Sequence, residues 1–118
     1  MTVVLATGGR SFLDASRVWS TLDLLDAQMP GGVTKLIVGD AKGADAACLE
    51  WALHNGVTVT RVRADWGLHG RGAGPRRNQF MVDQAPLGTV VVAFPGGRGT
   101  ADCVRRAETA GFQVVRAD

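Results

Sequence analysis

The sequence predicts an α/β fold of the Rossmann-like, doubly wound type, with a mostly parallel five-stranded sheet and helices on both faces. Short apolar segments rich in β-branched residues alternate along the chain with segments whose apolar residues recur every three or four positions. Strands separated by helices favour parallel pairing, because parallel neighbours need crossover connections. The 118 residues contain no linker and no internal repeat, so we predict a single domain over 1–118.

Five segments have the composition of buried strands. They are short runs dominated by valine, with leucine, isoleucine or threonine, and turn residues follow most of them. The segment at 57–63 alternates apolar and polar residues, and the fourth segment is the most continuously apolar. The predicted strands cover 3–6, 35–39, 57–63, 89–94 and 112–116.

Four helices are predicted between these strands. The first follows the candidate N-cap Asp14 and ends at a Pro-Gly-Gly sequence. The second carries alanines, a cysteine and a tryptophan on one face and ends near 55–56, where Asn-Gly is a plausible C-cap. A long irregular stretch at 64–75 precedes a short third helix with Pro75 in its first turn. The last helix covers about 100–110.

Composition excludes several classes of protein. Hydrophobic residues make up 46% of the chain and charged residues 20%, and no apolar run has the length of a membrane span. The N-terminus has neither a basic region nor a long apolar stretch, so we expect a cytoplasmic protein without a membrane partner. Cys48 and Cys103 lack metal-ligand spacing, and His54 and His69 lack an obvious partner, so we expect no metal and no cofactor.

The unusual residues of the sequence follow the predicted strands. The segments are "TGGRSF", "GDAKGAD", "ADWG" and "FPGGRGT", after the first to fourth strands respectively. In open α/β sheets, ligands bind at the carboxyl ends of the strands, near the point where the strand order reverses. The four segments therefore predict a single ligand site at one edge of the sheet.

The glycine-rich segment after the fourth strand predicts a phosphate site. Pro95 ends the strand, Gly96, Gly97 and Gly99 leave the backbone bare, and Thr100 can cap the next helix or donate its hydroxyl. Unpaired amides at a helix N-terminus bind anions when no side chain blocks the approach. A tight turn without a ligand is the alternative. The sequence has neither a P-loop motif nor a G-x-G-x-x-G after the first strand.

Cationic and acidic side chains complete the predicted site. Guanidinium groups match phosphate oxygens, and carboxylates there could hold ribose hydroxyls or act as acid/base groups. Asp45 could instead be only a helix N-cap, and Trp66 could stack on a base or pack within its loop. Besides the glycine-rich segment, the predicted ligand-binding residues are Gly8, Gly9, Arg10, Gly39, Asp40, Gly43, Asp45, Asp65, Trp66, Arg76, Arg77 and Asn78.

The order of four motifs resembles one protein family. "GGRSFLD", "GDAKGADAACLEWA", "ADWGLHGRGAGPRRNQFM" and "FPGGRGTADCV" together resemble the SLOG superfamily, in its YspA/YpsA-like branch. The resemblance implies a Rossmann-like fold that binds nucleotides or nucleotide-derived ligands at the glycine loop. Relatives include the lonely-guy phosphoribohydrolases, which cleave the base–ribose bond of nucleoside monophosphates, and DprA, which binds single-stranded DNA.

The lonely-guy signature is only partly present. "PGGRGT" matches PGGxGTxxE, and "RNQFM" resembles the family's RKxxM segment, so Arg77 takes the place of the family's arginine. Cys103 stands where the signature has glutamate, and Asn78 replaces the lysine. Asp102 is one residue from the glutamate position, about 100° away on a helix. We therefore assign no catalytic residue, and Arg77, Asp45 and Asp102 stay candidates.

These observations predict a domain that binds a nucleotide or another ribose-phosphate compound, and the resemblance implies that it acts as a sensor. The alternative is a nucleoside-monophosphate N-glycosidic hydrolase. Single-stranded DNA binding is disfavoured, because the net charge is only +2 and no clear aromatic platform is evident. We also expect a homodimer or a higher homo-oligomer, since the related enzymes are dimers and Trp19, Trp51 or Phe80 could form an apolar face.

Overall fold

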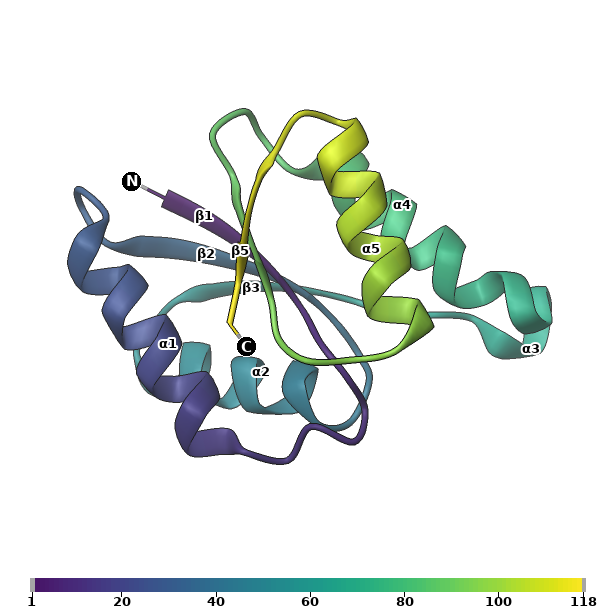
Figure 1. Cartoon of the computed structure of the whole chain (residues 1–118), viewed down its shortest axis with the longest axis horizontal. Helices are drawn as coiled ribbons and strands as arrows, with labels where there is room; N and C mark the ends of the chain where they lie inside the picture. The colour runs from purple at the N-terminus through teal and green to yellow at the C-terminus, as the bar shows by residue number, and fades with distance from the viewer. Residues whose placement is uncertain (1, 118) are drawn as a thin grey trace.

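The computed structural model describes residues 2–117, which contain one five-stranded sheet (Figure 1). All strand pairs are parallel, and the order is β3-β2-β1-β4-β5, which places β1 at the centre. The predicted α/β, Rossmann-like class is therefore confirmed, and every pairing is parallel. The strands are β1 (Thr2–Thr7), β2 (Val33–Gly39), β3 (Thr58–Val62), β4 (Val90–Ala93) and β5 (Gln113–Arg116).

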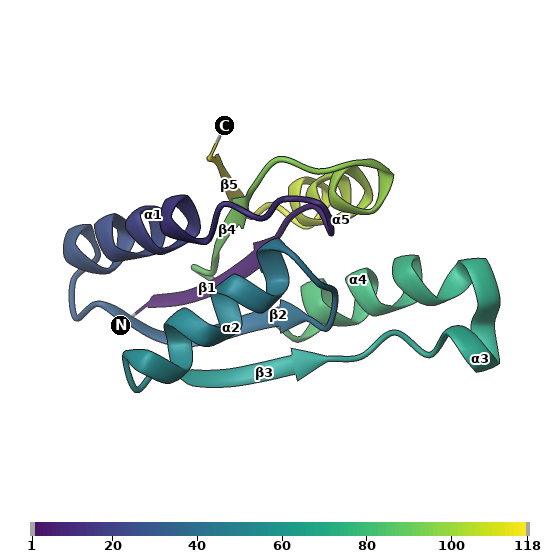
Figure 2. The same cartoon turned by 90° about the horizontal axis from the view of Figure 1, so that it is seen from below.

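Helices cover both faces of the sheet (Figure 2). In Figure 1, α1 and α2 lie together at the lower left, and α4 and α5 lie side by side at the upper right. None of the helices in the described range is both long enough and apolar enough to cross a membrane. The helices are α1 (Ala15–Gln28), α2 (Ala44–His54), α3 (Trp66–His69), α4 (Ala73–Gln84) and α5 (Arg98–Thr109), with a 3-10 turn η1 (Gly70–Gly72) before α4.

Two apolar clusters fill the spaces between the sheet and its helices. Successive strand side chains point to opposite faces, so Val4 and Ala6 of β1 face α1 and α2, whereas Leu5 faces α4 and α5. All three side chains are fully buried. Because both faces of the central strands are covered, these strands read as continuous apolar runs in the sequence.

Local signals set most helix ends where the sequence predicts them. The Asp14 carboxylate accepts a hydrogen bond from the Arg17 amide (3.1 Å), as expected of the N-cap of α1. Asn55 is the C-cap of α2, and its side-chain amide donates to the Trp51 carbonyl (2.8 Å). Pro75 lies in the first turn of α4, as predicted.

The predicted irregular stretch at 64–75 is wrong, since the chain is helical through most of it. Asp65 caps α3, and α4 begins at Ala73, two residues before the predicted proline. Glycines at 67, 70, 72 and 74 weaken the helical pattern in the sequence. Burial overrides this propensity only at the start of α4, where Ala73 is 1% exposed and Gly74 lies beneath the indole of Trp66. The exposed helix α3 buries no residue and is capped by the Asp65 side chain.

The structure removes Trp51 from the residues expected to form an apolar face for self-association, and the homo-oligomer stays a prediction. Trp51 is fully buried, and its indole N–H donates to Asp23 Oδ1 (2.8 Å). Trp19 packs against the cluster beneath α1 and α2 and against the His54 ring. Phe80 is 56% exposed but lies on α4, across the sheet from both tryptophans. The three side chains therefore do not share a surface.

Candidate functional site

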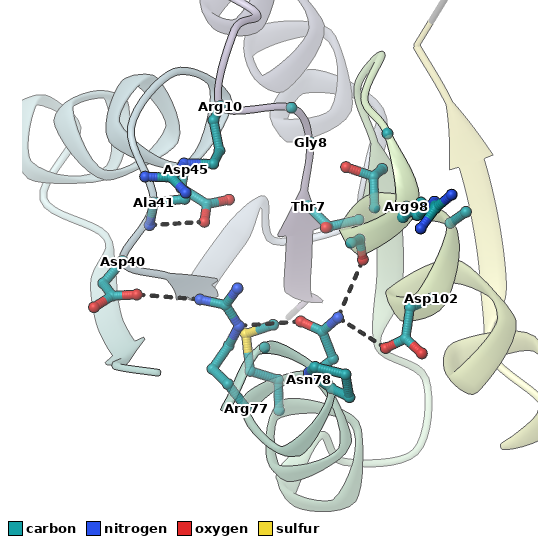
Figure 3. Close-up of a pocket in the computed structure, with 18 of the residues that line it drawn as sticks. Thr7, Gly8, Arg10, Asp40, Ala41, Asp45, Arg77, Asn78, Arg98 and Asp102 are labelled. Carbon is teal, nitrogen blue, oxygen red and sulfur yellow. Dashed lines mark hydrogen bonds and ion pairs between the residues drawn. The ribbon is translucent and has the colours of Figure 1, made fainter. Parts of the chain in front are cut away.

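A cavity of about 930 Å³ lies at the carboxyl ends of β1, β2 and β4 (Figure 3). Its walls come from the loops that follow these strands, from α4, and from the first turns of α5. The sheet order reverses at β1, because the chain builds β2 and β3 on one side of it and β4 and β5 on the other. The cavity thus occupies the place where open α/β sheets bind ligands.

The structure brings most of the predicted site residues to this cavity. They come from loops and from helices α2 to α5, on segments more than ninety residues apart in the sequence, and they include the candidate catalytic residue Asp102. The predicted residues that line the cavity are Gly8, Gly9, Arg10, Asp40, Asp45, Trp66, Arg77, Asn78, Gly97, Gly99, Thr100 and Asp102.

Six predicted residues do not line the cavity: Gly39, Gly43, Asp65, Arg76, Pro95 and Gly96. The Asp65 carboxylate instead accepts from the Leu68 amide (3.0 Å) as the N-cap of α3. The Pro95 carbonyl accepts from the Gly9 amide (2.8 Å). Arg76 is exposed. Helix capping therefore accounts for Asp65, and loop closure accounts for Pro95.

Glycine is required by close packing at several of these positions. A Cβ added to Gly8 would lie 2.5 Å from the Ala44 Cβ, and one added to Gly43 would lie 2.5 Å from the Gly9 carbonyl oxygen. Gly43 also has a φ of +72°, which L side chains rarely adopt. A Cβ on Gly96 would clash with the Thr100 side chain. These glycines let the loops after β1, β2 and β4 pack against one another.

Gly97 and Gly99 differ, because a Cβ added to either would meet no atom within 4 Å. Both line the cavity at the start of α5, where Gly97 is the N-cap residue without a side-chain cap. Within residues 2–117, no protein carbonyl accepts from the amides of Arg98, Gly99 or Thr100. These first-turn amides are free at the positive end of the helix dipole, as the sequence predicts.

The sequence reasoning missed several cavity residues, above all Arg98 and Arg105. Arg98 sits inside the glycine-rich motif itself. Positions 98, 101, 102 and 105 follow helical spacing, so they share one face of α5. This spacing was the signal that could have identified Arg105. The other missed residues are Thr7, Ala41, Lys42, Arg71, Gly74, Pro75, Met81 and Ala101.

A chain of polar contacts crosses the cavity from β2 to α5 (Figure 3). Arg77 Nη1 donates to Asp40 Oδ1 (3.2 Å), and Arg77 Nε donates to Asn78 Oδ1 (3.0 Å). The Asn78 side-chain amide donates to the Gly99 carbonyl (3.1 Å) and to Asp102 Oδ2 (3.0 Å). Asn78 is only 3% exposed, so this network joins α4 to the first turn of α5 in a nearly dry environment.

Asp102 faces the cavity, although its helical angle from the glutamate position suggested otherwise. It also pairs with Arg105 (2.8 Å) and Arg106 (2.9 Å). Partial burial acts to raise the pKa of Asp102, but hydrogen bonds from Arg106 and Asn78 outweigh this effect and lower the pKa. Cys103, by contrast, is fully buried, and burial raises the pKa of its thiol to about 11. Cys103 is therefore not a reactive thiolate at neutral pH.

Asp45 is a cavity carboxyl rather than an N-cap. The N-cap of α2 is Gly43, and Asp45 Oδ2 accepts from the Ala41 amide (3.2 Å). The residue is 6% exposed. Burial raises the pKa of Asp45 to about 6, against the opposing effects of the Ala41 hydrogen bond and the Arg77 charge. A carboxyl with this pKa exchanges protons near neutral pH.

The cavity carries an excess of positive charge and an exposed aromatic ring. Six basic side chains (Arg10, Lys42, Arg71, Arg77, Arg98 and Arg105) and three carboxylates line it. Trp66 is 54% exposed, and the edge of its indole lies over Gly74. The ring therefore packs within its loop and keeps an accessible surface, and stacking on a base stays a prediction. No group of three or more His, Cys, Asp or Glu side chains in the described range could hold a metal ion.

The chain is similar to known proteins in sequence. A model of the "YspA, cpYpsA-related SLOG family" matches residues 2–69, more than half of the chain. The chain is 39% identical over 122 residues to the Gene 61 protein of Mycobacterium phage D29, covering 98% of this chain and 95% of that protein.

A solved structure shares the fold. The X-ray structure of DNA processing protein A (DprA) from Streptococcus pneumoniae superposes with a TM-score of 0.57 at 18% identity, over 98% of this chain. The match covers 58% of the DprA chain, so this protein spans little more than half of that protein's length. Sequence motifs, family model and fold agree, and the chain belongs to the YspA, cpYpsA-related SLOG family.

Proposed function

We propose that the cavity binds a nucleotide or a nucleotide-derived ligand, with its phosphate at the N-terminus of α5. The observation that carries this proposal is the open first turn of α5. Its amides are unpaired within the described residues, and Gly97 and Gly99 face the cavity with free space where a side chain would be. Membership of the SLOG family supports a nucleotide-related ligand.

Electrostatics at the α5 end of the cavity favours an anion. Helix N-termini carry a partial positive charge and present N–H donors. Arg98 and Arg105 lie on the cavity face of the same helix, and Arg10 reaches the cavity from the loop after β1. All three residues are exposed, so their guanidinium groups can reorient to form paired hydrogen bonds with phosphate oxygens.

The opposite end of the cavity suits the rest of a nucleotide. Asp40 and Asp45 offer acceptors for sugar hydroxyls, and Trp66 offers a ring on which a base can stack. The volume of about 930 Å³ lies in the range of small-molecule sites and exceeds the needs of a phosphate ion alone. The arrangement therefore fits a ligand with an anionic end, a hydroxylated middle and a planar end.

Isothermal titration calorimetry with nucleoside 5′-monophosphates and the matching nucleosides tests the proposal. We expect the nucleotides to bind at least about tenfold more tightly than the nucleosides, because only the nucleotides place an anion on the α5 amides. Gly99→Leu should abolish this preference by filling the space above the amides. Thr109→Leu, which adds the same side chain at the exposed far end of α5, is the matched control.

Two results would contradict the proposal. One is the absence of nucleotide binding by a protein that unfolds cooperatively and is therefore folded. The other is nucleotide binding that Gly99→Leu leaves unchanged, which would place the ligand elsewhere. Binding without conversion of the nucleotide would favour a sensor over an enzyme for the nucleotides tested.

A second candidate function is hydrolysis of the N-glycosidic bond of a nucleotide. Asp45 favours it, since a buried carboxyl with a pKa of about 6 can donate a proton to a leaving base. Chromatographic detection of free base after incubation with nucleoside monophosphates is the test. We expect Asp45→Asn to stop base release even at a nucleotide concentration that saturates the variant. Binding without any base release would exclude this activity for the nucleotides tested.

Single-stranded DNA is the third ligand class to be separated. The fold is shared with a DNA-processing protein, but the cavity combines its six basic side chains with three carboxylates. Binding to an oligodeoxynucleotide with a steep salt dependence would favour DNA over a mononucleotide. Weak binding without a salt slope would exclude DNA.

A further inference from the structure

The Arg77 side chain already donates hydrogen bonds to protein oxygens, although the motif resemblance places this residue among the ligand contacts. Its side chain is 13% exposed and forms an ion pair with Asp40. Its guanidinium group lies directly over Gly39, where any Cβ would collide with Nη1. Nε is occupied by Asn78. Since two of its nitrogens hold protein oxygens, Arg77 is a poor candidate for the main phosphate contact.

The carboxylates beside Arg77 each keep one oxygen free. Asp40 Oδ1 accepts from Arg77 and from the Ala64 amide (3.4 Å), and Asp45 Oδ2 accepts from the Ala41 amide. Within residues 2–117, no donor reaches Asp40 Oδ2 or Asp45 Oδ1. Both side chains line the cavity, and Asp45 is more than nine-tenths buried.

The two carboxylates are near neighbours. Asp45 Oδ2 and Arg77 Nη1 crowd the same point above the Gly39 Cα, and Nη1 also contacts Asp40. Arg77 therefore sits between the two acids and offsets their mutual repulsion. A phosphate group is repelled here, whereas neutral hydroxyl groups can donate to the two free oxygens.

We infer that Asp40 and Asp45 form a receptor for the 2′- and 3′-hydroxyls of a ribose, with Arg77 as the positioning residue that holds the pair. The inference rests on the proposed function and narrows its ligand class to ribonucleotides. A 2′-deoxyribonucleotide leaves one carboxylate oxygen without a donor in a largely dry site. Sites built to bind a hydroxyl discriminate strongly against analogues that lack it.

The test compares the affinities of matched ribonucleotides and 2′-deoxyribonucleotides. The probes are AMP, GMP, CMP and UMP with their 2′-deoxy counterparts, titrated by calorimetry at constant salt. We expect at least one ribonucleotide to bind roughly 10- to 100-fold more tightly than its deoxy partner, the range for a lost hydrogen bond to a charged group.

Three variants separate the roles of the residues. Asp45→Asn and Asp40→Asn should each reduce the ratio of ribo to deoxy affinity towards one, while the preference for nucleotides over nucleosides persists at the α5 end. Arg77→Lys keeps the charge but cannot form both hydrogen bonds of the fork. It should therefore lower the same ratio without affecting that preference for phosphate.

The outcomes distinguish this inference from the proposed function. Equal affinity for ribo and deoxy probes would overturn the ribose receptor and leave the phosphate site intact. A ratio of ribo to deoxy affinity that none of the three variants changes would also overturn the ribose receptor. Another group would then recognise the hydroxyl. Failure of all eight probes to bind a cooperatively unfolding protein would overturn the proposed function together with this inference.

Discussion

Two walls of the cavity, the loop after β1 and the segment after β4, contain similar glycine-rich sequences. The glycines of these two walls have different structural roles. In the loop after β1, Gly8 and Gly9 admit no side chain, because Ala44, Phe94 and Pro95 lie against them. In the segment after β4, Gly97 and Gly99 face empty space. The first pair is required by the packing of the protein, whereas the packing places no such requirement on the second pair.

The walls also differ in how their polar groups are used. The loop after β2 packs on the loop after β1 at Gly43 and belongs to the same wall. It presents carboxylates that the Ala41 and Ala64 amides and Arg77 hold in place. The α5 wall presents unpaired amides and exposed arginines. A glycine-rich loop therefore indicates a ligand only when the glycines leave open space and free donors. Glycines enclosed by protein atoms indicate close packing.

The largest effect in this comparison is expected for Gly8→Val. The new Cβ would lie 2.5 Å from the Ala44 Cβ and 2.9 Å from the Phe94 Cβ, and both neighbours are buried. Overpacking of this kind should lower the free energy of unfolding by about 3 kcal/mol or prevent folding. Urea denaturation measures this change in the free energy of unfolding. A variant of wild-type stability would show that the β1 wall is not closely packed.

Asp45→Asn should stabilise the protein above pH 6. Burial raises the pKa of the folded state from 3.8 to about 6, so the native protein binds this proton more tightly than the unfolded chain does. Stability is therefore lost as the pH rises from about 4 through 6. The loss reaches roughly 3 kcal/mol at higher pH. Asparagine keeps an acceptor for the Ala41 amide and does not ionise.

The check is the difference in unfolding free energy between this variant and the wild type from pH 4 to pH 7.5, in which most other titrations cancel. The difference should grow up to about pH 6 and then level off. The charged groups that influence Asp45 are Arg77, Asp40 and Arg61. A difference that stays constant with pH would mean that the Asp45 carboxyl is well solvated.

Asn78→Ala should remove the hydrogen bonds that join α4 to the first turn of α5. The side chain accepts from Arg77 and donates to Gly99 and Asp102, all in a nearly dry position. Its loss should lower the free energy of unfolding by about 1–3 kcal/mol, because the partners are left unsatisfied. Gln79→Ala, on the same helix but less buried, provides a comparison. Equal effects of both variants would show that Asn78 contributes no more to stability than the half-buried Gln79, which accepts from Arg106 Nη1 (2.8 Å).

The smallest effect, and one of opposite sign, is expected for Gly99→Ala. A Cβ at this position meets nothing within 4 Å, and the backbone is helical. Alanine should raise the free energy of unfolding by about 0.5 kcal/mol, because glycine is a poor helix former. A clear loss of stability in urea denaturation would mean that Gly99 is required for packing, like the glycines of the opposite wall.

The alternation of elements and the edge that holds the site could be predicted from the sequence. Strands and helices carry their periodicity locally, and Asp14 and Asn55 act at the helix ends where they stand. Segment 64–75 was misjudged because its glycines suppress the helical signal, whereas the burial of Ala73 and the packing of Trp66 over Gly74 leave no periodic pattern in the sequence.

The roles of individual site residues were harder to predict, since their neighbours are remote in sequence. Arg77 pairs with Asp40, 37 positions away, and Gly8 contacts Phe94. Spacing shows that an arginine or a glycine lies near the sheet edge, but not whether protein atoms already occupy it. Helical spacing alone would have found Arg105, because that signal is local to α5.

The central position of β1 has a consequence for the thermodynamics of the domain. The cavity takes groups from the loop after β2 on one side of β1 and from the loop after β4 and α5 on the other. A molecule that contacts both sides acts as a clamp between the two halves of the chain. Its occupancy adds RT ln(1 + [L]/Kd) to the stability of the whole unit. Ligand concentration should thus shift the global melting temperature rather than protect one loop.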